Sequence, residues 1–220
     1  MTRSGGYRDR SHGGHALAAE LSALAGRDDV VVLALPRGGV PVAAEVARAL
    51  GAPLDAFVVR KLGVPGHEEL AFGAVASGRV RVLNDDVVGA LRLPDDVIER
   101  VTAAGHDAVT ARESSLRGDR PLPALAGRIV LLVDDGLATG ATMRAAVEAA
   151  RRVDPARVVV AVPVGPPEAC VELAAVADEV VCPLRPPAFG AVGLWYDDFD
   201  ATTEDEARRI LDAAASGRER

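Results

Sequence analysis

Short apolar runs alternate along this chain with longer segments in which apolar residues recur at helical spacing. Because parallel strands are buried on both faces, such continuous runs are typical of a parallel sheet. Strands are predicted at 30–35, 56–60, 127–135, 156–164 and 179–184, an extended pair at about 70–77 and 79–84, and helices at 14–24, 40–50, 93–116, 142–153 and 167–176. This order predicts an α/β fold, with a mostly parallel sheet and helices on both faces.

One domain is expected over residues 1–220, because the sequence has neither an internal repeat nor a low-complexity linker. The core of this domain is expected at about 28–182, the range that contains the predicted strands. The polar helical pattern within about 84–118 is an insertion, and a C-terminal appendage follows the last strand. Tyr7, Arg8, Asp9 and Arg10 form a charged cluster before the first helix, for which a solvated N-terminal arm is expected.

Composition and charge restrict the partners. The net charge of −7 argues against a nucleic-acid or anionic-membrane surface, because binding to phosphate backbones needs clustered Lys and Arg. No apolar stretch approaches the roughly 18 residues of a membrane helix, and the N-terminal segment lacks an apolar signal core. A cytoplasmic protein without membrane or nucleic-acid partners is therefore expected. Cys170 and Cys182 have neither CxxC nor metal spacing, which predicts reduced thiols.

Two loops at predicted strand ends carry positive charge, and ligands of open α/β sheets bind at such loops. In ALPRGGVP, Arg37 precedes Gly38 and Gly39, which permit close backbone approach and expose amide N–H groups to an anion. The alternative is a glycine turn with a solvated arginine. In VVRKLG, Arg60 stands beside Lys61, the one lysine of the sequence.

A third loop, GLATGAT, follows Asp134 and Asp135. Its small residues bring successive amides into the N-terminus of the next predicted helix, with Thr139 and Thr142 as hydroxyl donors. The helix dipole favours a phosphate there by roughly 0.3–2 kcal/mol. The loop is not a Walker loop, because no lysine follows its second glycine, and it lacks the G-x-G-x-x-G fingerprint. A tight turn capped by aspartate is the alternative for DDG alone.

The segment IVLLVDDGLATGAT resembles the phosphoribosyl pyrophosphate (PRPP) motif of type I phosphoribosyltransferases. The resemblance extends over about 30–199, through PRGG, the basic pair RK and FGAVGLWYDDF, which is similar to the hood of purine salvage members. The chain is most similar to stand-alone members of mostly unassigned substrate. The resemblance implies the type I fold, a small hood at about 183–200 beside the N-terminal arm, and Mg²⁺-dependent transfer of the 5-phosphoribosyl group from PRPP to a nitrogenous acceptor.

The resemblance also implies a role for each matched residue. Asp134 and Asp135 hold the ribose hydroxyls and help place Mg²⁺, partly through PRPP or water. The 5′-phosphate lies against Ala138, Thr139, Gly140, Ala141 and Thr142. The pyrophosphate meets Arg37, Gly38, Gly39, Arg60 and Lys61, and the peptide bond entering Arg37 is expected to be cis. Asp134, Asp135, Arg60 and Lys61 form the catalytic set, because charge develops beside them during transfer.

Transfer from PRPP also requires that water be excluded. The segment KLGVPGHEEL, with two glycines and a proline, is the candidate lid, and His67, Glu68 and Glu69 within it are candidates for substrate contact. An ordinary surface hairpin is equally compatible with this segment.

Departures from the family pattern bear on the acceptor. Gly136 replaces the usual apolar residue after the acids, which is expected to loosen the backbone. Ala138 stands where hypoxanthine and guanine enzymes carry an aspartate taken as the general base, so 6-oxopurine chemistry is disfavoured. VPVGPP has no counterpart of the lysine that reads a purine oxo group. Residues expected to contact a planar acceptor, or else to serve as core anchors, are Phe189, Trp195 and Tyr196, with Asp197 as hydrogen-bond acceptor.

The favoured function is a transferase whose partners are PRPP and a small-molecule acceptor. The alternative is a PRPP-binding regulator or sensor without turnover, against which the absence of a basic nucleic-acid surface weighs. A third class, a different nucleotide-binding α/β protein, requires the aspartate pair to be incidental. A homodimer is left open.

Overall fold

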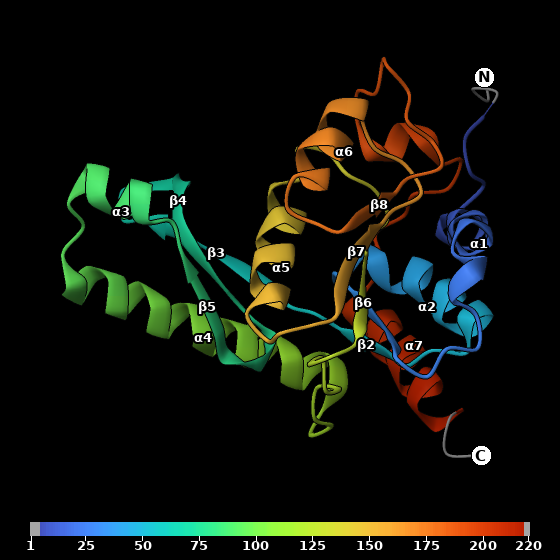
Figure 1. Cartoon of the computed structure of the whole chain (residues 1–220), viewed down its shortest axis with the longest axis horizontal. Coiled ribbons are helices and arrows are strands. Elements are labelled where there is room, and N and C mark those ends of the chain that lie inside the picture. Colours follow the sequence, from blue (N-terminus) through green and yellow to red (C-terminus); the bar gives the residue numbers. More distant parts are fainter. Residues whose placement is uncertain (1–4, 218–220) are drawn as a thin grey trace.

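The computed structural model describes residues 5–217 and contains two separate sheets (Figure 1). The larger sheet is parallel throughout and has the strand order β2-β1-β6-β7-β8. Its strands are β1 (Val30–Ala34), β2 (Leu54–Ala56), β6 (Ile129–Val133), β7 (Arg157–Ala161) and β8 (Glu179–Val181). The predicted fold class is confirmed.

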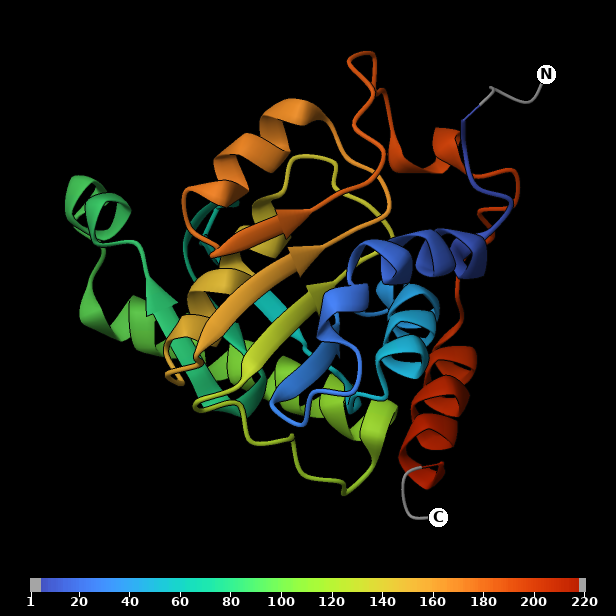
Figure 2. The same ribbon diagram turned by 45° about the vertical axis from the view of Figure 1, so that its right-hand side comes forward.

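Alternate residues of each central strand pack in opposite layers, which explains why these strands are apolar throughout. In β1, Val30 packs in the hydrophobic cluster that contains α2, whereas Val31 packs in the cluster that contains α5. Figure 2 shows α1 and α7 beside α2 on one face and α5 and α6 on the other. These helices are α1 (Arg10–Glu20), α2 (Gly39–Leu50), α5 (Ala141–Arg151), α6 (Pro167–Ala174) and α7 (Glu204–Ser216).

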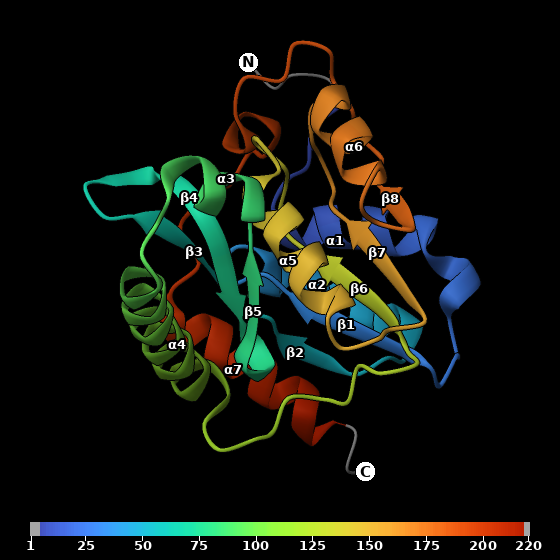
Figure 3. The ribbon, with the colours of Figure 1, turned by 60° about the vertical axis from the view of Figure 1, so that its left-hand side comes forward.

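The smaller sheet is antiparallel and contacts both α4 and α5 (Figure 3). Its strands are β3 (Val59–Val64), β4 (His67–Ala76) and β5 (Val80–Leu83), which confirms the predicted extended pair. The helical pattern at 93–116 forms α4 (Asp95–Arg117), preceded by α3 (Asp85–Leu91). Single 3-10 turns lie at η1 (Ser22–Leu24), η2 (Ser77–Arg79) and η3 (Val192–Trp195).

The strand predicted at 56–60 is wrong, because this run is divided between the two sheets. After β2 ends at Ala56, the N–H of Phe57 donates to the Ala34 carbonyl at 2.8 Å. The N–H of Val58 then donates to the Ser77 hydroxyl at 2.9 Å. Arg60 therefore lies inside β3, the edge strand of the antiparallel sheet, and not at the end of a parallel strand. The apolar run AFVV hides this change of sheet because its residues are buried or half-buried on both sides of the change.

The helices at the two ends of the described chain differ from the prediction: the first lies four residues earlier than the predicted 14–24, and the last was not expected. Helix α1 begins at Arg10, because the carboxylate of Asp9 caps it by accepting the N–H of His12 at 2.7 Å. Helix α7 was not predicted, although the Thr203 hydroxyl accepts the N–H of Glu206 at 3.2 Å in the capping pattern T-x-x-E. Within residues 5–217, no helix has the length and apolarity needed to cross a membrane.

Candidate active site

The adjacent acids Asp134 and Asp135 stand at the carboxyl end of β6, the middle strand of the parallel sheet. Asp134 Oδ1 accepts the backbone N–H of Asp135 at 2.9 Å. Burial raises the pKa of Asp134 well above its ordinary range, and the charge of Asp135 adds to this effect. Burial also raises the pKa of Asp135, against the opposing influence of the Arg10 guanidinium. Keeping both acids charged therefore costs the fold free energy.

We expect Asp134→Asn to raise the free energy of unfolding at pH 7 by about 0.5–2 kcal/mol, because it removes a buried charge next to a second acid. Gains of this size are common when a residue kept for function at the expense of stability is replaced. Asparagine keeps the oxygen that accepts the Asp135 N–H but cannot ionise. Because the folded pKa of Asp134 lies above its unfolded value near 3.9, the folded state holds more protons in that interval and stability falls as pH rises through it. The advantage of the variant should therefore shrink towards pH 4. Urea unfolding at both pH values tests this, and equal stability at pH 7 contradicts it.

The glycine loop after β1 lies directly against the acid pair. The peptide bond between Pro36 and Arg37 is cis, as expected, and the Arg37 side chain is exposed. A Cβ atom on Gly38 would lie 2.1 Å from Asp135 Oδ2, and one on Gly39 would lie 2.7 Å from the Val133 carbonyl oxygen. Both glycines are thus required by close approach, and neither has a positive φ. The glycine loop and the acid pair therefore pack directly against each other.

The loop after the acids opens into a small cavity at the start of α5. The cavity holds about 180 Å³ and is lined by Asp134, Gly136, Leu137, Ala138, Thr139, Gly140, Ala141, Thr142, Met143 and Val192. Gly140, with φ 72°, precedes α5 and supplies no side-chain cap. The Thr139 hydroxyl accepts the Ala141 N–H in a long hydrogen bond of 3.4 Å. The amides that follow in the first turn of α5 have no side-chain cap and are available to an anion.

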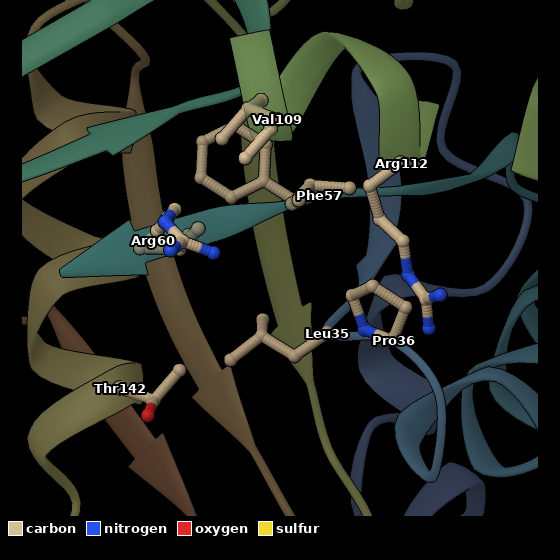
Figure 4. Close-up of a pocket in the computed structure, with 10 residues that line it drawn as sticks. Leu35, Pro36, Phe57, Arg60, Val109, Arg112 and Thr142 are labelled. Atoms are coloured by element: carbon tan, nitrogen blue, oxygen red, sulfur yellow. The ribbon is translucent and has the colours of Figure 1, made fainter. Parts of the chain in front are cut away.

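Two further cavities adjoin this one, since Thr142 lines all three. The first, of about 270 Å³, lies between Arg60 on β3 and Arg112 on α4, with Leu35, Pro36 and Phe57 on its walls (Figure 4). The second, of about 700 Å³, is lined by both Arg60 and Lys61 and by residues of α4. The predicted basic pair thus borders the site from the antiparallel sheet.

The hood aromatics are mainly packing residues. Phe189 and Tyr196 are buried, at 8% and 7% exposure, so neither offers an open ring face, and the core-anchor alternative fits these two. Tyr196 donates its hydroxyl to the Asp135 carbonyl at 2.6 Å, and burial raises its pKa. The Trp195 indole donates to the Phe189 carbonyl at 2.9 Å, and the Asp197 side chain is exposed.

The N-terminal arm belongs to the site, so the solvated arm expected from the sequence is wrong. Tyr7 is buried, its hydroxyl donates to the Pro163 carbonyl at 2.9 Å, and burial raises its pKa to about 12. Arg10 donates to Asp135 Oδ2 at 2.8 Å. Within the cluster, Tyr7 and Arg10 are drawn out of solvent, Arg10 because the largely buried Asp135 carboxylate is its partner, whereas Arg8 stays exposed. Sequence reasoning missed Arg10, since no motif links the two positions.

Gly136 does not loosen the loop as expected, because a neighbouring side chain fills the space. A Cβ atom on Gly136 would lie 2.6 Å from Val192 Cγ1 and 3.0 Å from the Val164 carbonyl oxygen. The hood therefore reaches the residue directly after the acid pair.

The comparisons with known proteins agree on one family. A family model described as the phosphoribosyl transferase domain matches residues 11–192. Two relatives from Mycobacterium tuberculosis, strains CDC 1551 and H37Rv, each named "Putative phosphoribosyl transferase", are 49% identical over 208 residues, which cover 94% of this chain and 47% of theirs. This chain thus spans about half the length of these curated relatives. The crystal structure of TT1426 from Thermus thermophilus is 47% identical, with a TM-score of 0.84 over 93% of this chain and 97% of that one. The resemblance carried by IVLLVDDGLATGAT is confirmed, and the chain belongs to the phosphoribosyltransferase family.

Proposed function

We propose that this chain moves the 5-phosphoribosyl group from PRPP to a nitrogenous base or a similar small acceptor, with Mg²⁺, and releases pyrophosphate. The observation that carries the proposal is the meeting of three groups at the carboxyl ends of the central strands of the parallel sheet. These are the acid pair, the glycine loop packed against it, and the uncapped start of α5. They match the needs of ribose hydroxyls, pyrophosphate and a 5′-phosphate respectively.

The chemistry explains why both signs of charge are present. Breaking the bond between C1′ and the pyrophosphate oxygen develops positive charge on the ribose and negative charge on the leaving group. In the proposed mechanism, Asp134 and Asp135 bind the ribose hydroxyls beside the positive charge. Arg37, the amides of Gly38 and Gly39, and the basic pair Arg60 and Lys61 stabilise the leaving group. One well-placed donor of this kind contributes on the order of 10²–10³ in rate.

The donor set fits a Mg²⁺ ion held partly by substrate. Mg²⁺ is usually bound by one or two carboxylates together with substrate oxygens and water. Asp134 and Asp135 supply two carboxylates, and nowhere in the described chain do three or more His, Cys, Asp or Glu side chains gather as a metal site. The bound ion would neutralise charge on the pyrophosphate.

The β3–β4 hairpin, residues 61–70, is the proposed lid. Its tip carries exposed side chains, and Gly66 takes the left-handed conformation that its turn needs, with φ 81°. Glu68 and Glu69 line the 700 Å³ cavity, so closure of the hairpin would bring them and His67 towards the substrate and exclude water.

The acceptor is proposed to lie between the start of α5 and the hood. Trp195 and Asp197 remain the candidate contacts from the hood, and Ala138 supplies no base. The buried free thiols Cys170 and Cys182 fit a reducing compartment, and we include a cytoplasmic location in the proposal.

The test is acceptor-dependent release of pyrophosphate. The protein is incubated with PRPP, Mg²⁺ and a panel of nucleobases, and pyrophosphate is followed by a coupled assay. We expect release with at least one acceptor, and none from the Asp134→Asn, Asp135→Asn variant. PRPP binding without release across the panel would favour a sensor, and absence of PRPP binding would refute both functions.

A further inference from the structure

The side chain of Arg10, the first residue of α1, is held by three contacts beside the acid pair. Its Nε donates to Asp135 Oδ2 at 2.8 Å, and its Nη1 donates to the Asp200 carbonyl at 2.7 Å. Its guanidinium carbon lies 3.9 Å from the centre of the Phe199 ring. The side chain is only 11% exposed. Contacts at Nε, at Nη1 and on one face of the planar group together fix the orientation of this guanidinium.

The Asp135 carboxylate depends on this guanidinium for its position. Its side chain is 14% exposed, and Oδ2 is the oxygen that faces both Arg10 and the Cα of Gly38. Among residues 5–217, Arg10 is the one side chain that bonds to this carboxylate. No side chain among the described residues bonds to Oδ1, so this oxygen can accept a hydrogen bond from a ligand.

We propose that Arg10 is a positioning residue of the phosphoribosyl site: it holds Oδ2 of Asp135 so that Oδ1 is presented to a ribose hydroxyl. This inference rests on the proposed function. The arm that carries Arg10 is in turn held by the hood, because the N–H of Asp197 donates to the Tyr7 carbonyl at 2.9 Å and that of Asp198 to the Arg8 carbonyl at 2.8 Å. The Asp135 carboxylate, which is proposed to bind the ribose, is therefore oriented through the hood, the segment that would also cover the acceptor.

Three variants separate charge from packing. Arg10→Met keeps an apolar stem over Phe199 but removes every donor, whereas Arg10→Lys keeps the charge and loses the planar fork. Arg8→Gln is the matched control, because it removes the same charge from an exposed side chain two residues away.

The readout compares two ligands. PRPP needs the ribose carboxylates, whereas inorganic phosphate needs only the loop at 138–142. We expect Arg10→Met to weaken PRPP binding at least about tenfold in calorimetry, as for a lost charged hydrogen bond. Arg10→Lys should recover part of this loss, and Arg8→Gln should bind as the parent does. Phosphate binding, followed by NMR titration, should be the same in all four proteins.

Unchanged PRPP affinity in Arg10→Met overturns the proposal, and so does an equal loss of PRPP and phosphate, which indicates a general structural effect. A crystal structure of ligand-free Arg10→Met provides a test that does not depend on PRPP. We expect the Asp135 carboxylate to turn from its parent orientation, and an unchanged orientation refutes the positioning role. Failure of the parent protein to bind PRPP would instead refute the proposed function.

Discussion

The Asp134→Asn, Asp135→Asn variant is expected to bind PRPP at least roughly 10²–10³-fold more weakly than the parent protein. Each carboxylate is proposed to accept a hydrogen bond from a ribose hydroxyl, and hydrogen bonds to charged groups contribute about 1.5–3 kcal/mol each. The amides lack that charge and are also poor ligands for Mg²⁺. Calorimetric titration with PRPP and Mg²⁺ measures the effect, and an unchanged affinity would remove the site from the acid pair.

The chain offers a matched control for this variant. Asp85 and Asp86 are also adjacent aspartates, but they are exposed in the first turn of α3. Asp85→Asn with Asp86→Asn makes the same change in net charge and should bind PRPP as the parent does. The two double variants therefore separate loss of the site from a general change in electrostatic potential.

The second large effect is on stability. Arg117→Met is expected to lower the free energy of unfolding by about 3–5 kcal/mol, because it leaves a buried acid without its partner. Arg117 is 3% exposed, and its Nη2 donates to the Ala56 carbonyl at 2.7 Å and to Glu113 Oε1 at 3.2 Å. Its Nε lies 3.4 Å from Asp55 Oδ1. Burial raises the pKa of Asp55 while Arg117 opposes the rise, so removal of the guanidinium leaves only the cost.

Thermal and urea unfolding measure this loss, with about 2–4 °C expected per kcal/mol for a chain of this size. The control is Arg120→Met, because Arg120 pairs with Asp212 at the surface, where such pairs contribute about 0–1 kcal/mol. Adding Asp55→Asn to Arg117→Met should recover part of the loss, since the more deeply buried of the two acids left without a partner is then neutral. If the Arg117 and Arg120 variants lose equal stability, the buried pair has no special role.

Most strands of the parallel sheet can be predicted from the sequence, because each is marked by a pattern within its own few residues. Apolar runs such as 30–35 are buried on both faces, and DDGLATGAT sits where a strand ends. The Arg10 contact with Asp135 could not be read in this way, since it joins positions 125 residues apart and no periodicity marks it. The division of 56–60 between two sheets was hidden for a different reason, because both sheets bury the same residue types. Helix α7 did carry a local signal in the spacing of Thr203 and Glu206, although no helix was predicted there.

Because Gly136 and Val192 pack so closely, a substitution at one of these positions limits which residues fit at the other. A larger residue at 136 requires the hood residue to shrink or the hood to move away from the acids. Homologues with an apolar side chain after the acid pair should therefore carry a smaller or displaced residue at the position of Val192. Libraries that aim to change the acceptor should randomise both codons together, because changing either alone samples mainly clashes and voids.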